Sequence, residues 1–305
     1  MSQEPIRVPL IPTCSACIID SLTTLVPLLT DDAHEQFRLF QLAFKKLAEG
    51  FEKQIEPAPL SIELYQMLYT EANVTDPYED IKRRSIQAAE QVLPAVEKHI
   101  ENLEGYERLR AGIAAAITGN VIDFNTAGHR PDFDKLEDQY QTILAEGFVL
   151  DDSEELWWAI KSQKGTVVFL GDNAGENLFD IPLLRILKDH GWYIIYVVKG
   201  KAMINDATEE DLKGTEIEKL AEIKNSGAWA HGVPMQLVSR EFLETIAQAD
   251  LVISKGQANI ETFPEIQREL KVETYYISRA KCVHISQSIG ASKGDNIVLR
   301  RPATE

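Results

Sequence analysis

The sequence predicts an α/β protein in which a Rossmann-like parallel-sheet domain follows a mostly helical N-terminal domain. Over residues 14–118, apolar residues recur every three or four positions, which is the spacing of amphipathic helices. From residue 165 onward, short runs of β-branched and aromatic residues alternate with helical stretches, as in βαβ units with a parallel sheet. We therefore expect a helical domain over residues 1–150 and a Rossmann-like α/β domain over residues 151–305.

The N-terminal part contains successive segments with helical spacing and few strand-like runs. These segments are residues 17–29, 33–53, 59–72, 80–103 and 105–124. We interpret residues 120–138, which overlap the end of the last of these segments, as a connecting segment and a candidate lid over the site. Residues 151–164 predict one more helix, which leads into the first strand.

The second part contains four apolar runs that predict the central strands, each bounded by Gly, Asp, Asn or Lys. These runs lie within residues 166–173, 193–200, 249–257 and 273–280. Residues 234–239 (PMQLVS) predict a further short strand, and residues 296–302 (NIVLRRP) predict the last one. Helical stretches separate the strands at residues 176–191, 209–227 and 239–249.

The charge balance narrows the function. The chain has 31 Lys and Arg against 48 Asp and Glu, a net charge of −17, which excludes broad nucleic-acid binding because phosphate backbones require a basic face. A small phosphorylated substrate remains compatible if carboxylates hold a divalent cation. No apolar run reaches the ~20 residues that span a bilayer, and the start resembles no signal peptide. We therefore expect a cytoplasmic protein that binds no membrane.

Polar residues follow three of the predicted strands. In open parallel sheets, ligands bind beyond the carboxyl ends of the strands, so these positions are the informative ones. The first group is Asp172, Asn173 and Glu176; the second is Lys199, Gly200 and Asp206; the third is Lys255, Gly256, Asn259 and Glu261. Each group alone is also compatible with helix caps and solvated turns, but three groups at three strand ends favour a site.

These residue types indicate metal and phosphate chemistry. The oxygens of Asp172, Asn173 and Asp206 suit Mg²⁺, Mn²⁺ or a similar ion. Lys255 can meet a phosphate as a point charge, and Gly256 permits close approach of the backbone. A cation and a lysine around a phosphoryl group form the electrostatic arrangement of phosphoryl transfer or hydrolysis. The sequence contains no P-loop, no nucleophile elbow and no complete dinucleotide fingerprint.

The combined motifs resemble the DUF89 family of metal-dependent damage-control phosphatases, also called ARMT1-like. The resemblance runs from about residue 12 to residue 300. It lies in DNAGE after the first strand, in the Lys199-Gly200 and Asn205-Asp206 pairs, and in SKGQANIETF. Further motifs are similar to the prokaryotic branch of the family, namely Cys14-x-x-Cys17 and residues 76–85, 119–124 and 281–290.

The resemblance implies strand order 3-2-1-4-5 and hydrolysis of phosphomonoesters of small metabolites, such as sugar phosphates or damaged cofactor and nucleotide intermediates. It implies a divalent ion (Mn²⁺, Co²⁺, Ni²⁺ or Mg²⁺) on Asp172, Asn173 and Asp206, with Lys255 on the phosphate. We expect Asp172, Asp206 and Lys255 to be catalytic. Candidate substrate-binding residues are Glu176, Asn120, Asp123, Gly256, Asn259 and Glu261.

Two alternatives come from other classes of protein. One is an S-adenosylmethionine-dependent protein carboxyl methyltransferase, an activity assigned to a member of a related branch. The predicted second strand ends in Lys199-Gly200 rather than in an acidic residue, which disfavours an adenosine cofactor. The other is a metabolite-binding protein without catalysis. The sequence does not indicate an oligomeric state.

The cysteines permit a further site. Cys14-x-x-Cys17 starts a helical run, and Cys282-x-His284 places two soft ligands at strand spacing. Together they would make a Cys₃His zinc site if the start of the chain met its last strands. A redox role is a second interpretation. Burial as small apolar side chains is the interpretation that we favour.

Overall fold

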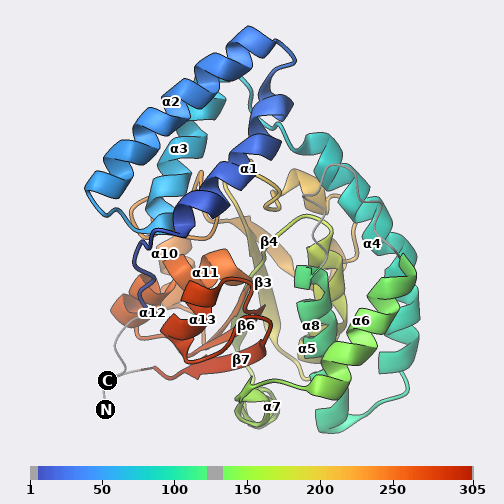
Figure 1. The fold of residues 1–305 in the computed structure, drawn as a ribbon. Coiled ribbons are helices and arrows are strands. Elements are labelled where there is room, and N and C mark those ends of the chain that lie inside the picture. The colour runs from blue at the N-terminus through green and yellow to red at the C-terminus, as the bar shows by residue number, and fades with distance from the viewer. Residues whose placement is uncertain (1–5, 122–132, 304–305) are drawn as a thin grey trace.

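The computed structural model describes residues 6–121 and 133–303, and Asp123 lies outside these ranges. The N-terminal part is helical, as predicted, and every predicted helix is present (Figure 1). Its helices are α1 (Cys14–Leu29), α2 (Ala33–Glu52), α3 (Pro57–Ala72), α4 (Glu79–Ile100), α5 (Gly105–Val121) and α6 (Phe133–Glu146). Helix α6 begins inside the segment that we expected to be a connection, so that interpretation is wrong from residue 133 onward.

The sheet is mostly parallel and has seven strands in the order β1-β7-β6-β5-β2-β3-β4. The strands are β1 (Leu150–Asp151), β2 (Thr166–Leu170), β3 (Tyr193–Val198), β4 (Glu222–Asn225), β5 (Leu251–Lys255), β6 (Thr274–Arg279) and β7 (Asn296–Arg301). The parallel strands β4-β3-β2-β5-β6 reproduce the expected order 3-2-1-4-5. Strand β7 then pairs antiparallel to β6, and β1 pairs parallel to β7.

Two sequence predictions in the sheet are wrong. Strand β4 lies inside residues 209–227, where helical spacing predicted a helix. Residues 234–239, predicted as a strand, form turns instead, and Met235 and Val238 pack from this loop against the core. Met235 and Val238 are thus partly buried by a loop, whereas Leu237 is exposed. A pattern of apolar residues does not distinguish such a loop from a strand.

Shorter helices connect the strands and cover both faces of the sheet. They are α7 (Ser153–Ser162), α8 (Ile181–Asp189), α9 (Ile217–Leu220), α10 (Arg240–Ala247), α11 (Gln257–Thr262), α12 (Pro264–Leu270) and α13 (Val283–Ile289), with 3₁₀ turns η1 (Glu176–Asp180) and η2 (Glu210–Leu212). Local chemistry fixes several ends. Ser239 caps α10 by accepting from the N–H of Phe242, and Pro264 occupies the first turn of α12.

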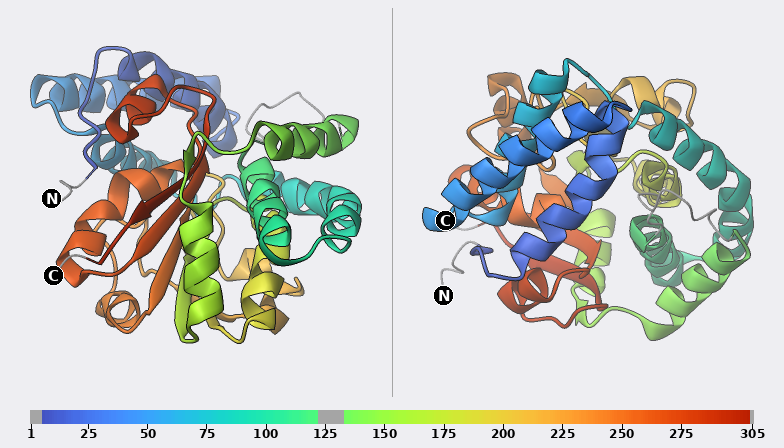
Figure 2. Two further views of the ribbon diagram at one scale, coloured as in Figure 1. Left: turned by 90° about the horizontal axis from the view of Figure 1, so that it is seen from below. Right: turned by 45° about the horizontal axis from the view of Figure 1, so that its top comes forward.

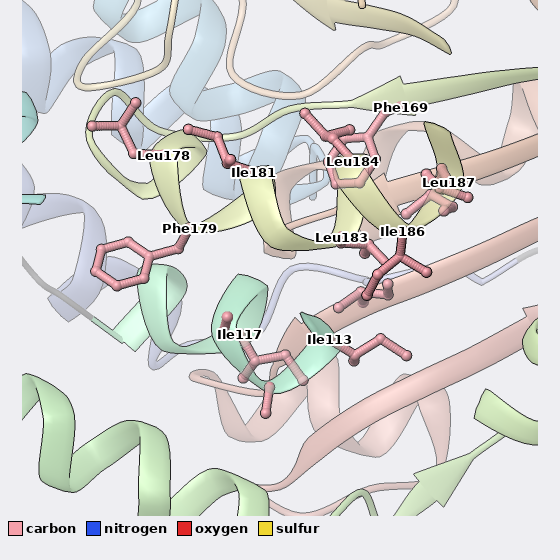
Figure 3. Close-up of a cluster of buried hydrophobic side chains, with 14 of the residues drawn as sticks. Ile113, Ile117, Phe169, Leu178, Phe179, Ile181, Leu183, Leu184, Ile186 and Leu187 are labelled. Carbon is pink, nitrogen blue, oxygen red and sulfur yellow. The ribbon is translucent and has the colours of Figure 1, made fainter. Parts of the chain in front are cut away.

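The core lies on both faces of the sheet because side chains alternate along each strand. Val167 and Phe169 of β2 belong to the cluster under α4, α5, α7 and α8, whereas Val168 and Leu170 belong to the cluster under α10 to α13. Figure 3 shows the first cluster, where Ile113 and Ile117 of α5 meet the apolar side of α8. Helices α4 to α6 share this apolar cluster with the sheet. The domain boundary that we expected at residue 150 stays a prediction.

Helices α1 to α3 form a separate layer over the carboxyl ends of the strands (Figure 2). Their buried apolar side chains make one cluster, which also includes Met203 from the segment after β3. This layer places helical residues opposite the strand ends at which we predicted a site. No helix in the described part of the chain is both long and apolar enough to cross a membrane.

Candidate active site

The backbone brings the three predicted metal ligands together. Asn173, just beyond β2, makes an antiparallel bridge with Asp206, which follows β3. The N–H of Ala207 donates to the carbonyl of Asp172 over 3.0 Å, and the N–H of Ala174 donates to the carbonyl of Asn205 over 2.9 Å. Asp172 and Asp206 are both buried. Asn173 and Asp206, which are 33 positions apart, are thus neighbours because the parallel strands β2 and β3 end side by side.

The third strand end reaches the same place through Gly256. A Cβ atom on Gly256 would lie 1.9 Å from Oδ2 of Asp172, and the φ angle of this residue is +90°. Only glycine adopts that backbone conformation readily and leaves room for the carboxylate. The turn Lys255-Gly256 therefore packs directly on Asp172, as the predicted convergence of strand ends requires.

Lys255 is fully buried and its charge is compensated within the protein. Its Nζ atom lies 2.9 Å from Oδ1 of Asp180 and 3.9 Å from Oε2 of Glu176, and it donates to the Glu176 carbonyl over 3.2 Å. Burial raises the pKa of Asp180 to about 6, although Lys255 and the hydroxyl of Tyr196 oppose the shift. Sequence reasoning missed Asp180. Its only signal was a carboxylate within the apolar run ENLFDIPLL.

Asp206 and Glu176 both lie near enough to Asp172 for its charge to act on them. Nζ of Lys199 lies 3.3 Å from Oδ2 of Asp206, and burial together with the nearby Asp172 raises the pKa of Asp206. Burial raises the pKa of Glu176 to about 7, and the charge of Asp172 is the second contribution. Nδ2 of Asn173 donates to Oε1 of Glu176 over 3.0 Å. Burial is the main cause of both shifts, and the charge of Asp172 adds to each of them.

The donor set fits a hard divalent cation. The amide N–H of Asn173 donates to Glu176. Its Oδ1 could therefore serve as a neutral oxygen ligand together with the carboxylates of Asp172 and Asp206. Within residues 6–121 and 133–303, no three His, Cys, Asp or Glu side chains are arranged to hold a metal. A cation here would therefore rest on two carboxylates, one amide and oxygens from water or substrate, as Mg²⁺ and Mn²⁺ accept.

The other predicted site residues are distributed as follows. Asn259 is buried, and its Nδ2 donates to the carbonyls of Lys255 (2.7 Å) and Gly171 (3.3 Å). Asn120 lies in the last turn of α5, where the structure does not describe its side chain. The preceding Gly119 packs on η1, since a Cβ there would lie 2.8 Å from the carbonyl oxygen of Glu176. The chain at Asn120 thus passes close to the site.

A cavity of about 380 Å³ lies beside this cluster, over the ends of β5 and β6 and beneath α1 and α3. Glu261 lines it, and burial raises the pKa of this carboxyl to about 7. His231 also lines it and makes a 2.7 Å hydrogen bond with Oγ of Ser61. Burial, with a smaller contribution from Lys199, lowers the pKa of His231 to about 4, which keeps its ring neutral.

Comparison with known proteins identifies the family to which the chain belongs. A family model described as a damage-control phosphatase ARMT1-like domain matches residues 10–297. The match covers nearly the whole chain, and the protein belongs to this family, as the sequence motifs predicted.

Individual relatives agree. A damage-control phosphatase from Pyrococcus horikoshii is 31% identical, covering 94% of this chain and 96% of the relative. An uncharacterised protein from Methanocaldococcus jannaschii is 33% identical over 95% of both chains. A crystal structure of a DUF89 family protein from P. horikoshii superposes with a TM-score of 0.83 at 30% identity, covering 96% of this chain and 99% of that one.

Proposed function

We propose that this protein is a metal-dependent phosphatase that hydrolyses phosphomonoesters of small metabolites. The observation that carries the proposal is the convergence of Asp172, Asn173 and Asp206 with the Lys255-Gly256 turn at one edge of the sheet. Membership of the damage-control phosphatase family and relatives of that name support the reaction class.

Asp172, Asn173 and Asp206 would hold the divalent ion, with Mn²⁺, Co²⁺, Ni²⁺ and Mg²⁺ as candidates. A divalent cation in a phosphatase polarises the phosphoryl group and brings the pKa of a water toward neutrality. Burial, with Asp172 as a further contribution, raises the pKa values of Glu176 and Asp206. A cation at this position would be attracted by these carboxylates and would favour their charged forms.

The protein's own groups orient and stabilise the phosphate. Lys255 supplies a fixed positive charge beneath the site, and Asp180 holds its ammonium in place. The N–H groups of residues 257–259 at the start of α11 would bind phosphoryl oxygens as charge develops. The N–H of Gly256 is not among them, because it donates to the carbonyl of Ile277. Either Asp172 or Asp206 would orient the attacking water.

The organic part of the substrate would occupy the adjacent cavity. A volume of about 380 Å³ matches a small metabolite, since ligand pockets are roughly 300–1,000 Å³. Glu261 in its wall would accept hydrogen bonds from substrate hydroxyls. Asn259 does not line this cavity, but its buried Oδ1 has no hydrogen-bond partner among the described residues, so Asn259 stays a proposed substrate contact. Glu176, Asn120 and Asp123 complete the proposed substrate contacts, and a cytoplasmic location fits the three free cysteines.

The test is phosphate release from a panel of phosphomonoesters, with and without Mn²⁺ or Co²⁺. We expect metal-stimulated release by the wild-type protein and a loss of at least a hundredfold in Asp172→Ala. Asp80→Ala serves as the matched control, because it removes a carboxylate that is exposed on α4. Full activity in Asp172→Ala would sink the assignment. Methyl transfer from S-adenosylmethionine without phosphate release would favour the alternative enzyme.

A further inference from the structure

All three cysteines of the chain meet at the cavity beside the site. Cys14 begins α1, Cys17 lies one turn later, and Cys282 immediately precedes α13. The three thiols line the same 380 Å³ cavity, and none forms a disulfide. Both views in Figure 2 place the start of α1 beside the segment that carries α13. The start of the chain thus meets residues that follow β6.

The thiols are also electrostatically close. The pKa of Cys17 is raised first by burial, then by Cys282 and then by Cys14. Cys282 therefore lies near enough to influence Cys17 although 265 positions separate them in the sequence. The expected strand spacing of Cys282 and His284 is wrong, because Cys282 immediately precedes α13 and His284 lies in the first turn of that helix.

A zinc site is not the use that this arrangement supports. In the described part of the chain, no three His, Cys, Asp or Glu side chains adopt a metal-binding arrangement, although three thiols and His284 share the cavity. The chemistry left to neighbouring free thiols in a reducing compartment is reversible oxidation, since cytosolic disulfides are usually transient and redox-sensing.

We propose that Cys17 and Cys282 form a reversible disulfide that ties α1 to the start of α13 and closes the cavity. Hydrogen peroxide is the oxidant: two thiols and one peroxide give one S–S bond and two waters. Cys14 supplies the exchange step. Its thiolate attacks the sulfur of Cys17, a Cys14–Cys17 bond forms, and Cys282 leaves as a thiolate.

The bond would act on turnover through the segment after β6. Lys281 directly precedes Cys282, lines the cavity, and donates its N–H to Oε1 of Gln257 at the start of α11. Its charge also acts on Glu176. A disulfide at Cys282 therefore restrains a segment that touches the site and narrows the space for the organic part of a substrate. This effect on turnover rests on the proposed phosphatase function, whereas the disulfide itself does not.

The experiment oxidises the reduced full-length protein with hydrogen peroxide, blocks free thiols with N-ethylmaleimide, and maps peptides by mass spectrometry. We expect a Cys17–Cys282 cross-linked peptide that dithiothreitol reverses, with phosphatase activity at least fivefold lower. Cys17→Ser and Cys282→Ser should keep their own reduced activity after oxidation. Cys14→Ser should still form the bond and lose activity, but yield no Cys14–Cys17 peptide.

Other outcomes overturn the proposal. The disulfide is contradicted if oxidation yields no intramolecular bond to Cys282. It is also contradicted if the reduced protein binds one equivalent of zinc and Cys282→Ser does not. A Cys17–Cys282 bond without loss of activity contradicts the closure of the cavity. A reduced protein that hydrolyses no ester contradicts the proposed function before any oxidant is added, and the peptide map still decides the disulfide.

Discussion

Nζ of Lys255 lies 2.9 Å from Oδ1 of Asp180, and neither side chain is exposed to solvent. Tyr196 reinforces the pair by donating its hydroxyl to Oδ2 of Asp180 over 2.6 Å. The ion pair joins the end of β5 to the end of η1, and the charge of Asp172 acts on both of its members. The position of the proposed phosphate-binding lysine therefore depends on a carboxylate that no family motif highlighted.

Replacing one member of this pair should destabilise the protein strongly. Asp180→Asn keeps the shape but removes the nearest counter-charge of the buried Lys255 and leaves only the more distant Glu176 at 3.9 Å. Breaking a buried ion pair costs about 3–5 kcal/mol. Urea unfolding measures the loss. In the double variant with Lys255→Met, we expect a smaller loss than the sum of the single losses. Additive losses would show that the two charges do not interact. Asp80→Asn, on the surface, should leave stability unchanged.

Gly256→Ala should abolish activity because the new methyl group would overlap the Asp172 carboxylate. The matched control is Gly214→Ala. Gly214 has a similar positive φ of +79°, but a Cβ atom there would meet no neighbouring atom within 4 Å, so this variant carries the backbone strain without the overlap. We expect a loss of at least a hundredfold in phosphate release for Gly256→Ala and less than threefold for Gly214→Ala. Equal losses would assign the effect to strain alone.

His231 should make stability fall in acid. Its pKa is about 4 in the folded protein, whereas an unperturbed histidine has a pKa of about 6.5. Between these values only the unfolded chain takes up the proton, so its contribution to the free energy of unfolding decreases by up to about 1.4 kcal/mol per pH unit as pH falls. His231→Gln removes this contribution. The difference between wild type and variant should therefore shrink below pH 6.5, and parallel curves would contradict a buried neutral ring.

Metal binding should be visible without catalysis. Because a cation would relieve repulsion between Asp172 and Asp206, Mn²⁺ added to chelator-treated protein should raise the melting temperature by several degrees. Asp206→Asn should respond much less, and Asp80→Asn should respond like the wild type. Chelation should also remove phosphate release, and the metal should restore it. An unchanged melting temperature in all three proteins would contradict a cation at this position.

The strands that could be predicted are those buried on both faces. Strands β2, β3, β5 and β6 are continuous runs of β-branched, aliphatic and aromatic residues, which parallel strands need when helices cover both sides. Strand β4 has the sequence EIKN and no fully buried residue, because it lies at an edge of the sheet. Its polar composition continues the helical pattern of the preceding residues, so local sequence offered no signal for it.

The site divides in the same way. Residues that directly follow strands, such as Asp172 and Lys255, were predictable because topology alone brings strand ends together. Asp180 was not, since its role depends on how η1 turns back over β5. The meeting of Cys17 with Cys282 was likewise beyond prediction. It depends on the layer formed by α1 to α3 covering the strand ends, a tertiary arrangement that no short motif encodes.

The pairing of β1 with β7 has a consequence for biosynthesis. Leu150 pairs only with Ile297, and the N–H of Asp152 donates to the carbonyl of Val298. The ribosome synthesises residue 150 long before residue 297. Strand β1 therefore has no pairing partner while the parallel strands assemble. Translation that stopped before Asn296 would leave the edge of β6 open to other chains. The sheet is therefore completed only when β7 has been translated and has paired with both β1 and β6.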